Sequence, residues 1–577
     1  MGKEAKPMRK ELTALRTKMK ERGIDLYIVP TTDAHGSEYV NDHFKCREYI
    51  SGFTGSAGTL VVQSDFAGLW TDGRYFLQAE QQLRGSGITL MKMGEPDVPE
   101  LESYLKEQPA GSTIGFDGTI ISHRLGAALE QNFHIVYDLD LVDEIWADRP
   151  RIRPSKIYAL PQNVTGEATN LKMVRVRAEM GAADYLLVSR LEDIAWLYNL
   201  RGRDIENTPV FYAFALISKD RDVLYVMDET YHAEDGQIKP YQDVFGNLKK
   251  LKNCTVMLDE DSVSYTISRC LDESVDCLFR KSPVERLKAV KNAVEIRSTK
   301  HAHLRDGAAM VNFLYWLKSN IGRILISEIS AADYLEMCRR EQGAYDLSFP
   351  TIAGYEAHGA IVHYAATADS NTDLQQKGLL LIDSGGQYED GTTDITRTVA
   401  LGDLDALRRT HYTAVLKGHI ALADAVFAKG TVGADLDFLA RRPLQDLELD
   451  FKHGTGHGVG HMLSVHEGPN TISPRAKNCE ILPGMITSDE PGVYLEDRYG
   501  IRIENELLCV ERAGQYAFET ITLCPYEREA IEVSMLTESE IAYIDRYHAK
   551  VYETLTPLLE TPIRDWLQQQ CRPLLQG

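Results

Sequence analysis

Two predicted β-hairpins in the carboxyl-terminal half of the chain carry acidic residues where a cation could bind. In the first hairpin an apolar strand ends in Asp383, and Asp394 begins an alternating strand after a glycine-rich turn. If this hairpin folds about Tyr388 and Glu389, we expect Asp383 and Asp394 to face each other, with Cβ atoms about 5 Å apart. Two facing carboxylates repel each other unless a cation or a proton lies between them.

A second hairpin repeats this arrangement. It carries Glu490 before its turn and Glu504 after it, and folding about Asp497 brings the two glutamates opposite each other. The alternative for either hairpin is an exposed acidic face with Arg397 or Arg502 as the nearby counter-ion. Because two such hairpins occur in one segment, we favour a cation site.

A glycine-rich loop with four histidines lies between the two hairpins. His453, His457, His461 and His466 fall within fourteen residues, and glycine occupies every second position from 454 to 460. Each glycine would cost about 1 kcal/mol in a helix, and no glutamate follows His453, so this is not the helical motif of H-E-x-x-H zinc enzymes. We expect an extended loop whose backbone approaches a bound group closely while the imidazoles point at it.

Together these residues predict a site for two divalent cations. Four carboxylates and one imidazole suit hard ions such as Mg²⁺ or Mn²⁺, whereas thiolate-rich sites favour zinc. Four negative charges also balance two dications, and a hydroxide that bridges the ions can then form at moderate pH.

Two related α/β units precede the segment that carries these residues. Gly23–Val29 follows an amphipathic helix pattern and predicts a buried strand, and Glu179–Val188 repeats the helix-then-strand pattern. We predict two α/β domains over residues 1–150 and 151–284, where prolines punctuate the chain, and a catalytic domain over residues 285–577. The alternative is a chance similarity between two helix-strand units.

Helices are predicted on both sides of the reactive segment. A long helical pattern begins at Val284, a second helix runs through Met310–Leu317, and residues 530–577 form terminal helices. Residues 345–510, between these helices, are rich in short strands, glycines, histidines and acids. We therefore expect this segment to hold the site and the helices to carry structure.

Composition limits the partners of the protein. The chain has 577 residues, of which 44% are hydrophobic and 26% charged, as is typical of soluble globular proteins. Its net charge of −22 disfavours binding to nucleic acid and to anionic lipid surfaces. No apolar run reaches the about 18 residues of a membrane span, and Met1–Lys10 lacks the apolar core of a signal peptide. The nine scattered cysteines, without a C-x-x-C pair, indicate reduced thiols and hence a cytoplasmic protein.

Taken in order, these motifs resemble the pita-bread metallopeptidases, the family of methionine aminopeptidase, prolidase and aminopeptidase P. The resemblance covers nearly the whole chain, and Gly52–Gly58, Thr71–Ala79 and Ile194–Gly202 are similar to stretches of the cytosolic, three-domain Xaa-Pro aminopeptidases. It implies an α/β (α+β) chain with two related creatinase-like domains and a carboxyl-terminal pita-bread catalytic domain. It also implies a homodimer formed through the catalytic domain.

The resemblance further implies the site residues. The family's metal ligands, which usually hold two Mn²⁺ ions, fall on Asp383, Asp394, His457, Glu490 and Glu504. Its histidines with roles in substrate binding and in stabilising the tetrahedral intermediate fall on His363, His453 and His466.

The reaction implied by the resemblance is hydrolysis of the bond between an amino-terminal residue and a following proline. A metal-bridging hydroxide would attack the carbonyl, Asp394 and Glu504 would bridge the ions, and Glu490 would also accept the proton of the water. An Xaa-Pro bond has no N–H, so a dedicated pocket is needed. Tyr364 and Tyr494 are candidates for this pocket, with plain core packing as the alternative.

Three other functions belong to the same fold. A prolidase, which cleaves Xaa-Pro dipeptides, uses the same ligands, but prolidases usually have one amino-terminal domain where this chain has two. A catalytically inactive pita-bread module that binds peptides, or a creatinase-like amidinohydrolase, would lack the acidic ligands. His461 extends the glycine loop and is expected behind the ligands or at the surface.

Overall fold

The computed structural model describes residues 9–232 and 237–575. The described chain packs as two compact units. The first comprises the chain up to Pro161 together with Glu167–Lys288, and the second comprises Gln162–Gly166 together with the chain from Ala289 onward. Met1–Met8, part of the segment in which we expect no signal peptide, lies outside the described residues. In the described ranges no helix combines the length and the hydropathy that a transmembrane span requires.

The first unit contains two six-stranded sheets. The strands of the first sheet are β1 (Leu26–Pro30), β2 (Thr59–Gln63), β3 (Ala67–Thr71), β4 (Thr89–Lys92), β5 (Thr113–Phe116) and β6 (His134–Val136). Those of the second are β8 (Tyr185–Val188), β10 (Ala213–Ser218), β11 (Asp222–Val226), β12 (Gln237–Pro240), β13 (Thr255–Leu258) and β14 (Asp276–Phe279). Two short strands, β7 (Tyr158–Ala159) and β9 (Leu200–Arg201), pair with each other.

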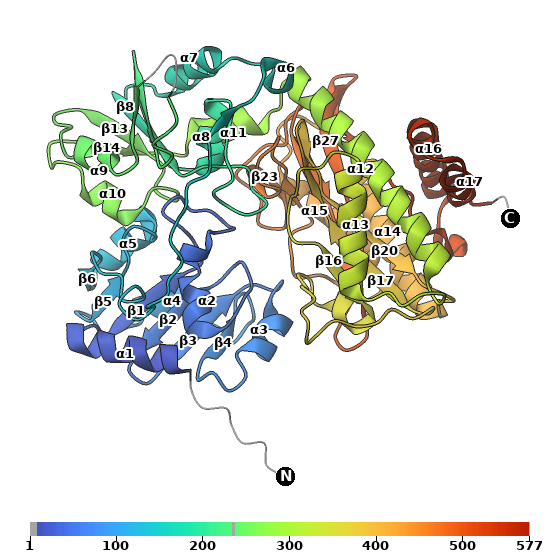
Figure 1. Ribbon diagram of the computed structural model, residues 1–577, viewed down its shortest axis with the longest axis horizontal. Coiled ribbons are helices and arrows are strands. Elements are labelled where there is room, and N and C mark those ends of the chain that lie inside the picture. Colours follow the sequence, from blue (N-terminus) through green and yellow to red (C-terminus); the bar gives the residue numbers. More distant parts are fainter. Residues whose placement is uncertain (1–8, 233–236, 576–577) are drawn as a thin grey trace, which may run out of the picture. The chain divides into compact units, whose positions relative to one another are not determined.

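Both sheets have the same topology. The strand orders are β4-β3-β2-β1-β5-β6 and β12-β11-β10-β8-β13-β14, and the parallel and antiparallel pairings correspond throughout. A helix precedes the first strand of each sheet, α1 (Lys10–Arg22) before β1 and α7 (Thr169–Glu179) before β8. Figure 1 draws the two sheets in blue and in green, with their helices. Two equivalent sheets in sequence confirm that the predicted similarity is structural, while the boundaries at residues 150 and 284 stay a prediction.

Shorter helices complete this unit. Those of the first half are α2 (Cys46–Ser51), α3 (Phe76–Gln82), α4 (Leu101–Lys106) and α5 (His123–Glu130). Those of the second half are α8 (Leu191–Leu197), α9 (Asp243–Leu248), α10 (Tyr265–Arg269) and α11 (Pro283–Ala289). Buried apolar residues of α2, α3, α4 and α5 share cores with the strands of the first sheet, which is the layered packing of α/β domains.

Two antiparallel sheets form the centre of the second unit. One consists of β16 (Ile352–Tyr355), β17 (Leu379–Ser384) and β20 (Ile395–Ala400). The other consists of β21 (Val426–Phe427), β28 (Gln515–Thr520), β27 (Asn505–Arg512), β24 (Ile486–Asp489), β22 (Gly456–Gly458) and β23 (Glu467–Ile472). Short sheets are formed by β15 (Asp346–Leu347), β18 (Gly386–Tyr388) and β19 (Gly391–Thr392), and by β25 (Gly492–Leu495) and β26 (Tyr499–Arg502).

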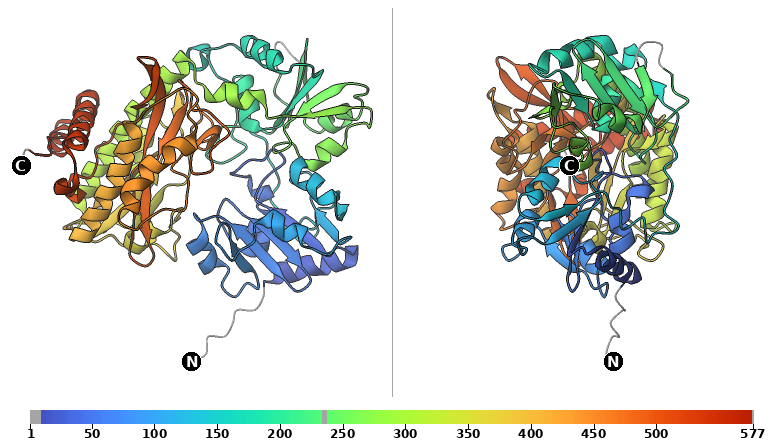
Figure 2. Two further views of the ribbon diagram at one scale, coloured as in Figure 1. Left: turned by 180° about the vertical axis from the view of Figure 1, so that it is seen from behind. Right: turned by 90° about the vertical axis from the view of Figure 1, so that its left-hand side faces the viewer.

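Each of these two sheets packs against a pair of helices. The helices α12 (Ala293–Asn320) and α13 (Glu328–Glu341) share a core with the β16-β17-β20 sheet, in which Phe313, Leu335 and Ile382 are buried. The helices α14 (Ala406–Ala423) and α15 (Gly433–Gln445) share another core with the six-stranded sheet. Figure 1 shows α12 and α13 side by side, and Figure 2 shows the orange pair of α14 and α15 from behind. The reactive segment thus supplies most strands of both sheets, together with α14 and α15.

The predicted helices agree with the structure at the carboxyl terminus but not at the start of the second unit. The pattern from Val284 is broken at residues 290–292, because Asn292 caps α12 through the backbone N–H groups of Val294 and Glu295. Met310–Leu317 belongs to this same helix, so the expectation of a separate second helix is wrong. The terminal helices are confirmed as α16 (Glu538–Leu555) and α17 (Thr561–Gln570).

Candidate metal centre

The first acidic hairpin has a register two residues away from the predicted one. Strands β17 and β20 place Asp383 opposite Thr396, so the expected facing of Asp383 and Asp394 is wrong. Tyr388 is fully buried and hydrogen-bonded, so it stays in the strand and the chain reverses at the more exposed Glu389–Asp390. A turn displaced by one residue moves the pairing by two and keeps both aspartates on one face, about 7–8 Å apart along the diagonal.

The second acidic hairpin has the predicted register. The pairings of β24 with β27 and of β25 with β26 both continue the alignment in which Glu490 lies opposite Glu504. Asp497 lies in the turn with a φ of 58°, a left-handed conformation that aspartate tolerates. The two glutamates therefore approach each other from neighbouring strands.

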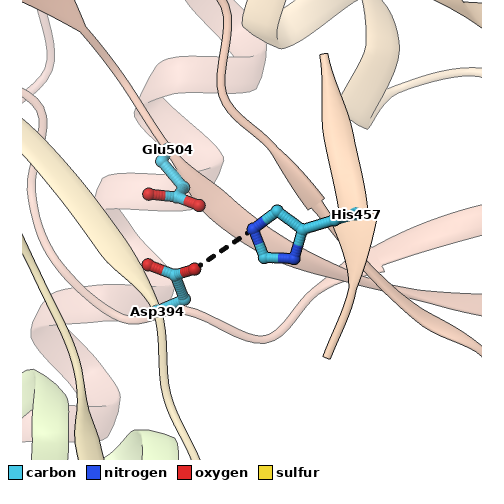
Figure 3. A group of neighbouring side chains, drawn as sticks. All are labelled: Asp394, His457 and Glu504. Carbon is cyan, nitrogen blue, oxygen red and sulfur yellow. Dashed lines mark ion pairs between the residues drawn. The ribbon is translucent and has the colours of Figure 1, made fainter. Parts of the chain in front are cut away.

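Three predicted ligands meet at the junction of these elements. Asp394, His457 and Glu504 each offer one ligand atom, and these atoms lie within 4.8 Å of one another. His457 Nε2 lies 3.4 Å from Asp394 Oδ2 and 3.3 Å from Glu490 Oε1. In Figure 3 the ring of His457 points toward the carboxylates of Asp394 and Glu504. Atoms that bind one ion at about 2.1 Å lie about 3–4 Å apart, so this spacing suits a shared cation.

The glycine loop orients the imidazole of His457. Its Nδ1 lies 3.0 Å from the carbonyl of Gly458, so that in the neutral ring Nδ1 can donate there and Nε2 can bind a metal, as in many metal-binding histidines. Ser488 Oγ accepts from the backbone N–H of His457 at 3.0 Å and donates to Glu490 Oε1 at 3.1 Å. A Cβ at Gly456 would lie 1.8 Å from the Ser488 carbonyl, which explains a glycine there. As predicted, this segment is extended and not helical.

Burial and mutual repulsion raise the pKa values of the acids. The pKa of Glu504 lies well above its ordinary range, first because the group is buried and then because Asp394, Glu490 and Asp383 surround it with negative charge. Burial also raises the pKa values of Glu490 and Asp383, and the charge of Asp394 adds to both. Burial alone would lower the pKa of His457, but its contacts with Asp394 and Glu490 raise it to about 9. A cation among these groups would relieve the repulsion.

Unpartnered oxygens show that the donor set fits hard cations. Among the described residues, Oδ1 of Asp383 and Oδ1 of Asp394 are buried without a hydrogen-bond partner, which is costly for a carboxylate. The other oxygen of Asp383 accepts from Arg502 Nη2 at 2.6 Å. Because the two aspartates are only 7% and 3% exposed, the alternative of an exposed acidic face is wrong, although Arg502 is a counter-ion.

Three residues outside the predicted set support the ligands. Thr396 Oγ1 donates to Glu504 Oε2 at 2.7 Å, and Glu506 Oε1 accepts from the backbone N–H of Asp394 at 2.8 Å. His303 Nε2 lies 3.1 Å from the second oxygen of Glu506, and both side chains are buried. The strand period of two puts Thr396 on the face of Asp394 and Glu506 on the face of Glu504, a signal that could have identified them. Nothing near His303 in the sequence points to the site.

The three histidines with implied substrate roles lie beside the cluster. The rings of His466 and His457 pack edge to face with centroids 4.3 Å apart. His453 Nε2 lies 2.8 Å from the Tyr494 hydroxyl, which accepts from Arg502 Nη1 at 2.7 Å. His363 is half-buried, and the carbonyl of the preceding residue, Val362, accepts from Arg502 Nη2 at 3.2 Å.

His461 and Tyr364, which the sequence analysis also named, are both buried. His461 is 2% exposed, with Nδ1 3.1 Å from Thr299 Oγ1 and Nε2 3.1 Å from the Val164 carbonyl, so it lies behind the loop and not at the surface. Tyr364 is 5% exposed, and its hydroxyl donates to Glu328 at 2.9 Å. Its part in a proline pocket stays a prediction.

Family models match almost the entire chain. The Creatinase/Prolidase N-terminal domain matches residues 12–149 and again, in a second form, residues 148–295. Metallopeptidase family M24 matches residues 297–511, and the C-terminal region of peptidase M24 matches residues 514–574. A probable Xaa-Pro aminopeptidase P of Laccaria bicolor is 38% identical to this chain, over 98% of this chain and 93% of its own. The chain belongs to metallopeptidase family M24.

Other M24 relatives are similar over both amino-terminal domains as well. Aminopeptidase P2 of Arabidopsis thaliana is 38% identical over 96% of this chain and 86% of its own length. The crystal structure of an X-prolyl aminopeptidase from Caenorhabditis elegans, described as a cytosolic enzyme with a di-nuclear active site, is 34% identical with a TM-score of 0.93, over 98% of this chain and 99% of its own. The predicted resemblance and fold, two creatinase-like domains before a pita-bread catalytic domain, are confirmed.

Proposed function

We propose that this M24 protein is a metal-dependent Xaa-Pro aminopeptidase, which releases the first residue of peptides whose second residue is proline. The observation that carries the proposal is the buried cluster of Asp394, His457 and Glu504. The relatives with both amino-terminal domains support the substrate class, because they are aminopeptidases P or probable Xaa-Pro aminopeptidases P over nearly their whole length.

Five side chains would hold two divalent ions, with Mn²⁺ as the expected metal: Asp383, Asp394, His457, Glu490 and Glu504. When bound, the ions would lower the pKa of water so that a hydroxide nucleophile forms near neutral pH. Carboxylate oxygens outnumber the single imidazole and no thiolate takes part, which suits a hard ion. Asp394 and Glu504 would hold the ions together with the other ligands: after burial, the other three carboxylates all raise the pKa of Glu504, and the charge of Asp394 acts on each of the other carboxylates.

The chain's own groups would handle the proton and the substrate. The side chains of His457 and Glu490 are 18% and 17% exposed, more than the aspartates, so the peptide would approach on their side. Glu490 would accept the proton of the attacking water, since burial raises its pKa and favours a proton on it. His363, His453 and His466 would hydrogen-bond the peptide and the developing oxyanion.

Penultimate proline needs its own recognition. The Xaa-Pro bond lacks the N–H that extended-substrate peptidases bind, so shape must replace that hydrogen bond. Tyr494 is the better candidate for this pocket, because its ring is half-buried beside His453 and its hydroxyl is held by Arg502. Plain core packing is the alternative for Tyr494.

Further features of the proposal concern the whole molecule. We propose domain boundaries near residues 150 and 284, a cytosolic location and a homodimer formed through the catalytic domain. The cytosolic relative from C. elegans and the nine free cysteines support the location. A net charge of −22 argues against nucleic acid as a partner.

A metal-reconstitution assay tests the proposal. Metal-free protein would receive Mn²⁺ and then an Xaa-Pro-Xaa tripeptide, the Xaa-Pro dipeptide or an Xaa-Ala-Xaa control. We expect metal-restored release of the first residue from the proline tripeptide. Cleavage of the dipeptide alone would mean prolidase, and no cleavage with any divalent ion would mean an inactive binding module.

A matched pair of variants makes the assay specific. Asp394→Asn keeps the shape of the side chain but removes its charge, so we expect metal binding and turnover to be lost together. Asp403→Asn, at an exposed position beyond β20, is the control and should match the wild type. Retained turnover in Asp394→Asn would contradict the assignment of this ligand.

A further inference from the structure

The loop that carries His363 is anchored by a buried carboxylate outside the metal centre. We propose that Glu328 is the positioning residue for His363. This inference rests on the proposed function, in which His363 hydrogen-bonds the substrate. Glu328 is the first residue of α13, its exposed fraction is 0%, and it is distant in sequence from every predicted site residue.

The two oxygens of Glu328 accept four hydrogen bonds from the connection between β16 and β17. Oε1 accepts from the backbone N–H of Tyr355 at 2.8 Å and from His358 Nδ1 at 2.8 Å. Oε2 accepts from the Tyr364 hydroxyl at 2.9 Å and from the backbone N–H of Thr372 at 3.0 Å. The four donors are spread over residues 355–372, so one carboxylate fixes this connection at four positions.

The start of α13 holds the same loop through its backbone. The N–H of Glu328 donates to the Thr372 carbonyl at 3.0 Å, and the N–H of Ile329 donates to Asn371 Oδ1 at 3.0 Å. Because α13 packs against α12 and β16 in a buried core, the carboxylate stands on a rigid element. Rotation of the side chain would break four bonds at once.

His363 lies in the chain between a residue bound by Arg502 and a residue bound by Glu328. On its amino side, the preceding carbonyl accepts from Arg502 Nη2, the same nitrogen that binds Asp383 at 2.6 Å. On its carboxyl side, Tyr364 is tied to Glu328 by its hydroxyl, and its ring stacks on His358 with centroids 4.5 Å apart. The backbone at position 363 is therefore held from both sides.

The loop is also seated on the hairpin that carries Glu490 and Glu504. A Cβ at Gly500 would lie 1.7 Å from the Gly359 carbonyl, so the two backbones touch. This contact fixes the loop against the hairpin at Gly359. The part of the loop after residue 360 is held by the hydrogen bonds with Arg502 and Glu328. None of the four hydrogen bonds of the Glu328 carboxylate goes to a predicted metal ligand, so we expect Glu328 to act on the substrate through His363.

The test uses Glu328→Gln in the full chain. Glutamine replaces one acceptor oxygen by a donor, so two loop donors lose their partner. We expect amide hydrogen exchange between residues 355 and 372 to accelerate about tenfold or more, and Mn²⁺ affinity to stay within about twofold of the wild type. We expect kcat/KM for the proline tripeptide to fall about 10- to 100-fold, and to fall no further when Glu328→Gln is added to His363→Asn.

Glu336→Gln is the matched control, because Glu336 lies on the same helix and pairs at the surface with Arg340. It should change none of these quantities. Unchanged exchange in the loop, a tenfold loss of Mn²⁺ affinity, or additive losses with His363→Asn would each overturn the proposal.

Two further arms keep the outcome interpretable. If the wild type with Mn²⁺ does not cleave the proline tripeptide, the proposed function fails, while hydrogen exchange and metal affinity still test the anchoring of the loop. If Glu328→Gln does not fold, Tyr364→Phe removes the one hydroxyl that donates to Glu328 Oε2. It should accelerate hydrogen exchange in the loop and lower kcat/KM in the same way, by smaller factors. Unchanged exchange and kcat/KM in Tyr364→Phe would then overturn the proposal.

Discussion

Replacing Thr396 by valine removes a hydrogen bond from a predicted metal ligand without changing the size of the side chain. Thr396 Oγ1 donates to Glu504 Oε2 at 2.7 Å, and both residues are buried. This bond favours the charged form of Glu504, whose pKa burial and the neighbouring carboxylates raise. In the valine variant the glutamate would hold its proton more tightly, and its carboxylate would lose the contact that orients it.

The size of the effect follows from the kind of bond. A hydrogen bond to a charged group is worth about 1.5–3 kcal/mol, and about 1.4 kcal/mol corresponds to a tenfold change in a binding constant. We therefore expect Thr396→Val to weaken Mn²⁺ binding about 10- to 100-fold, as for other groups that orient metal ligands. Valine fills the same space, but Arg502 Nε, which donates to Thr396 Oγ1 at 3.3 Å, loses that acceptor, so we expect a folded variant with a lower melting temperature.

Calorimetric titration of the metal-free protein with Mn²⁺ measures this effect. Thr398→Val is the matched control, because Thr398 lies on the same face of β20 and its hydroxyl exchanges hydrogen bonds with the backbone of Arg502, at 2.9 and 3.0 Å, and with no predicted ligand among the described residues. It should lower the melting temperature and leave Mn²⁺ affinity unchanged. Wild-type affinity in Thr396→Val, or an equal loss in both valine variants, would refute the reasoning.

Two more predictions concern the same centre. In the metal-free protein His457 has a pKa of about 9, so its ring is protonated at pH 7 and must lose that proton to bind a metal. Mn²⁺ binding should then release protons, and the affinity for Mn²⁺ should rise about tenfold per pH unit up to pH 9 because of this one group. Calorimetry in buffers of different ionisation enthalpy measures the released protons. No proton release, or an Mn²⁺ affinity that does not change with pH, would contradict the prediction. His303→Gln, which alters the partner of Glu506 behind Asp394, should weaken Mn²⁺ binding about tenfold or more. His301→Gln, at an exposed position on the same helix, is its control, and equal affinities in the two variants would contradict the role of His303.

The two hairpins show how far strand periodicity predicts this site. The alignment of Glu490 with Glu504 could be predicted, because the glutamates are equidistant from a turn residue that adopts a left-handed conformation. The alignment of Asp383 could not, because alternation does not say which of several polar residues makes the turn. A displacement of the turn by one residue placed Thr396, and not Asp394, opposite Asp383.

The supporting residues that lie on helices were beyond such reasoning. His303 and Glu328 lie on α12 and α13, and each reaches the site through packing between elements that are far apart in sequence. Neither helix has a local pattern that distinguishes these two residues from other buried polar ones. Motif spacing predicted the reactive side chains, whereas the contacts that hold those side chains depend on tertiary structure.

The central claim is that five side chains of one M24 domain hold two divalent ions. Anomalous diffraction from crystals of the Mn²⁺-loaded protein tests it most directly. We expect two peaks, each about 2.2 Å from a carboxylate oxygen of Asp394 or Glu504, with His457 Nε2, Asp383 and Glu490 completing the ligands. No peak at these residues, or a single ion bound elsewhere, would contradict the account.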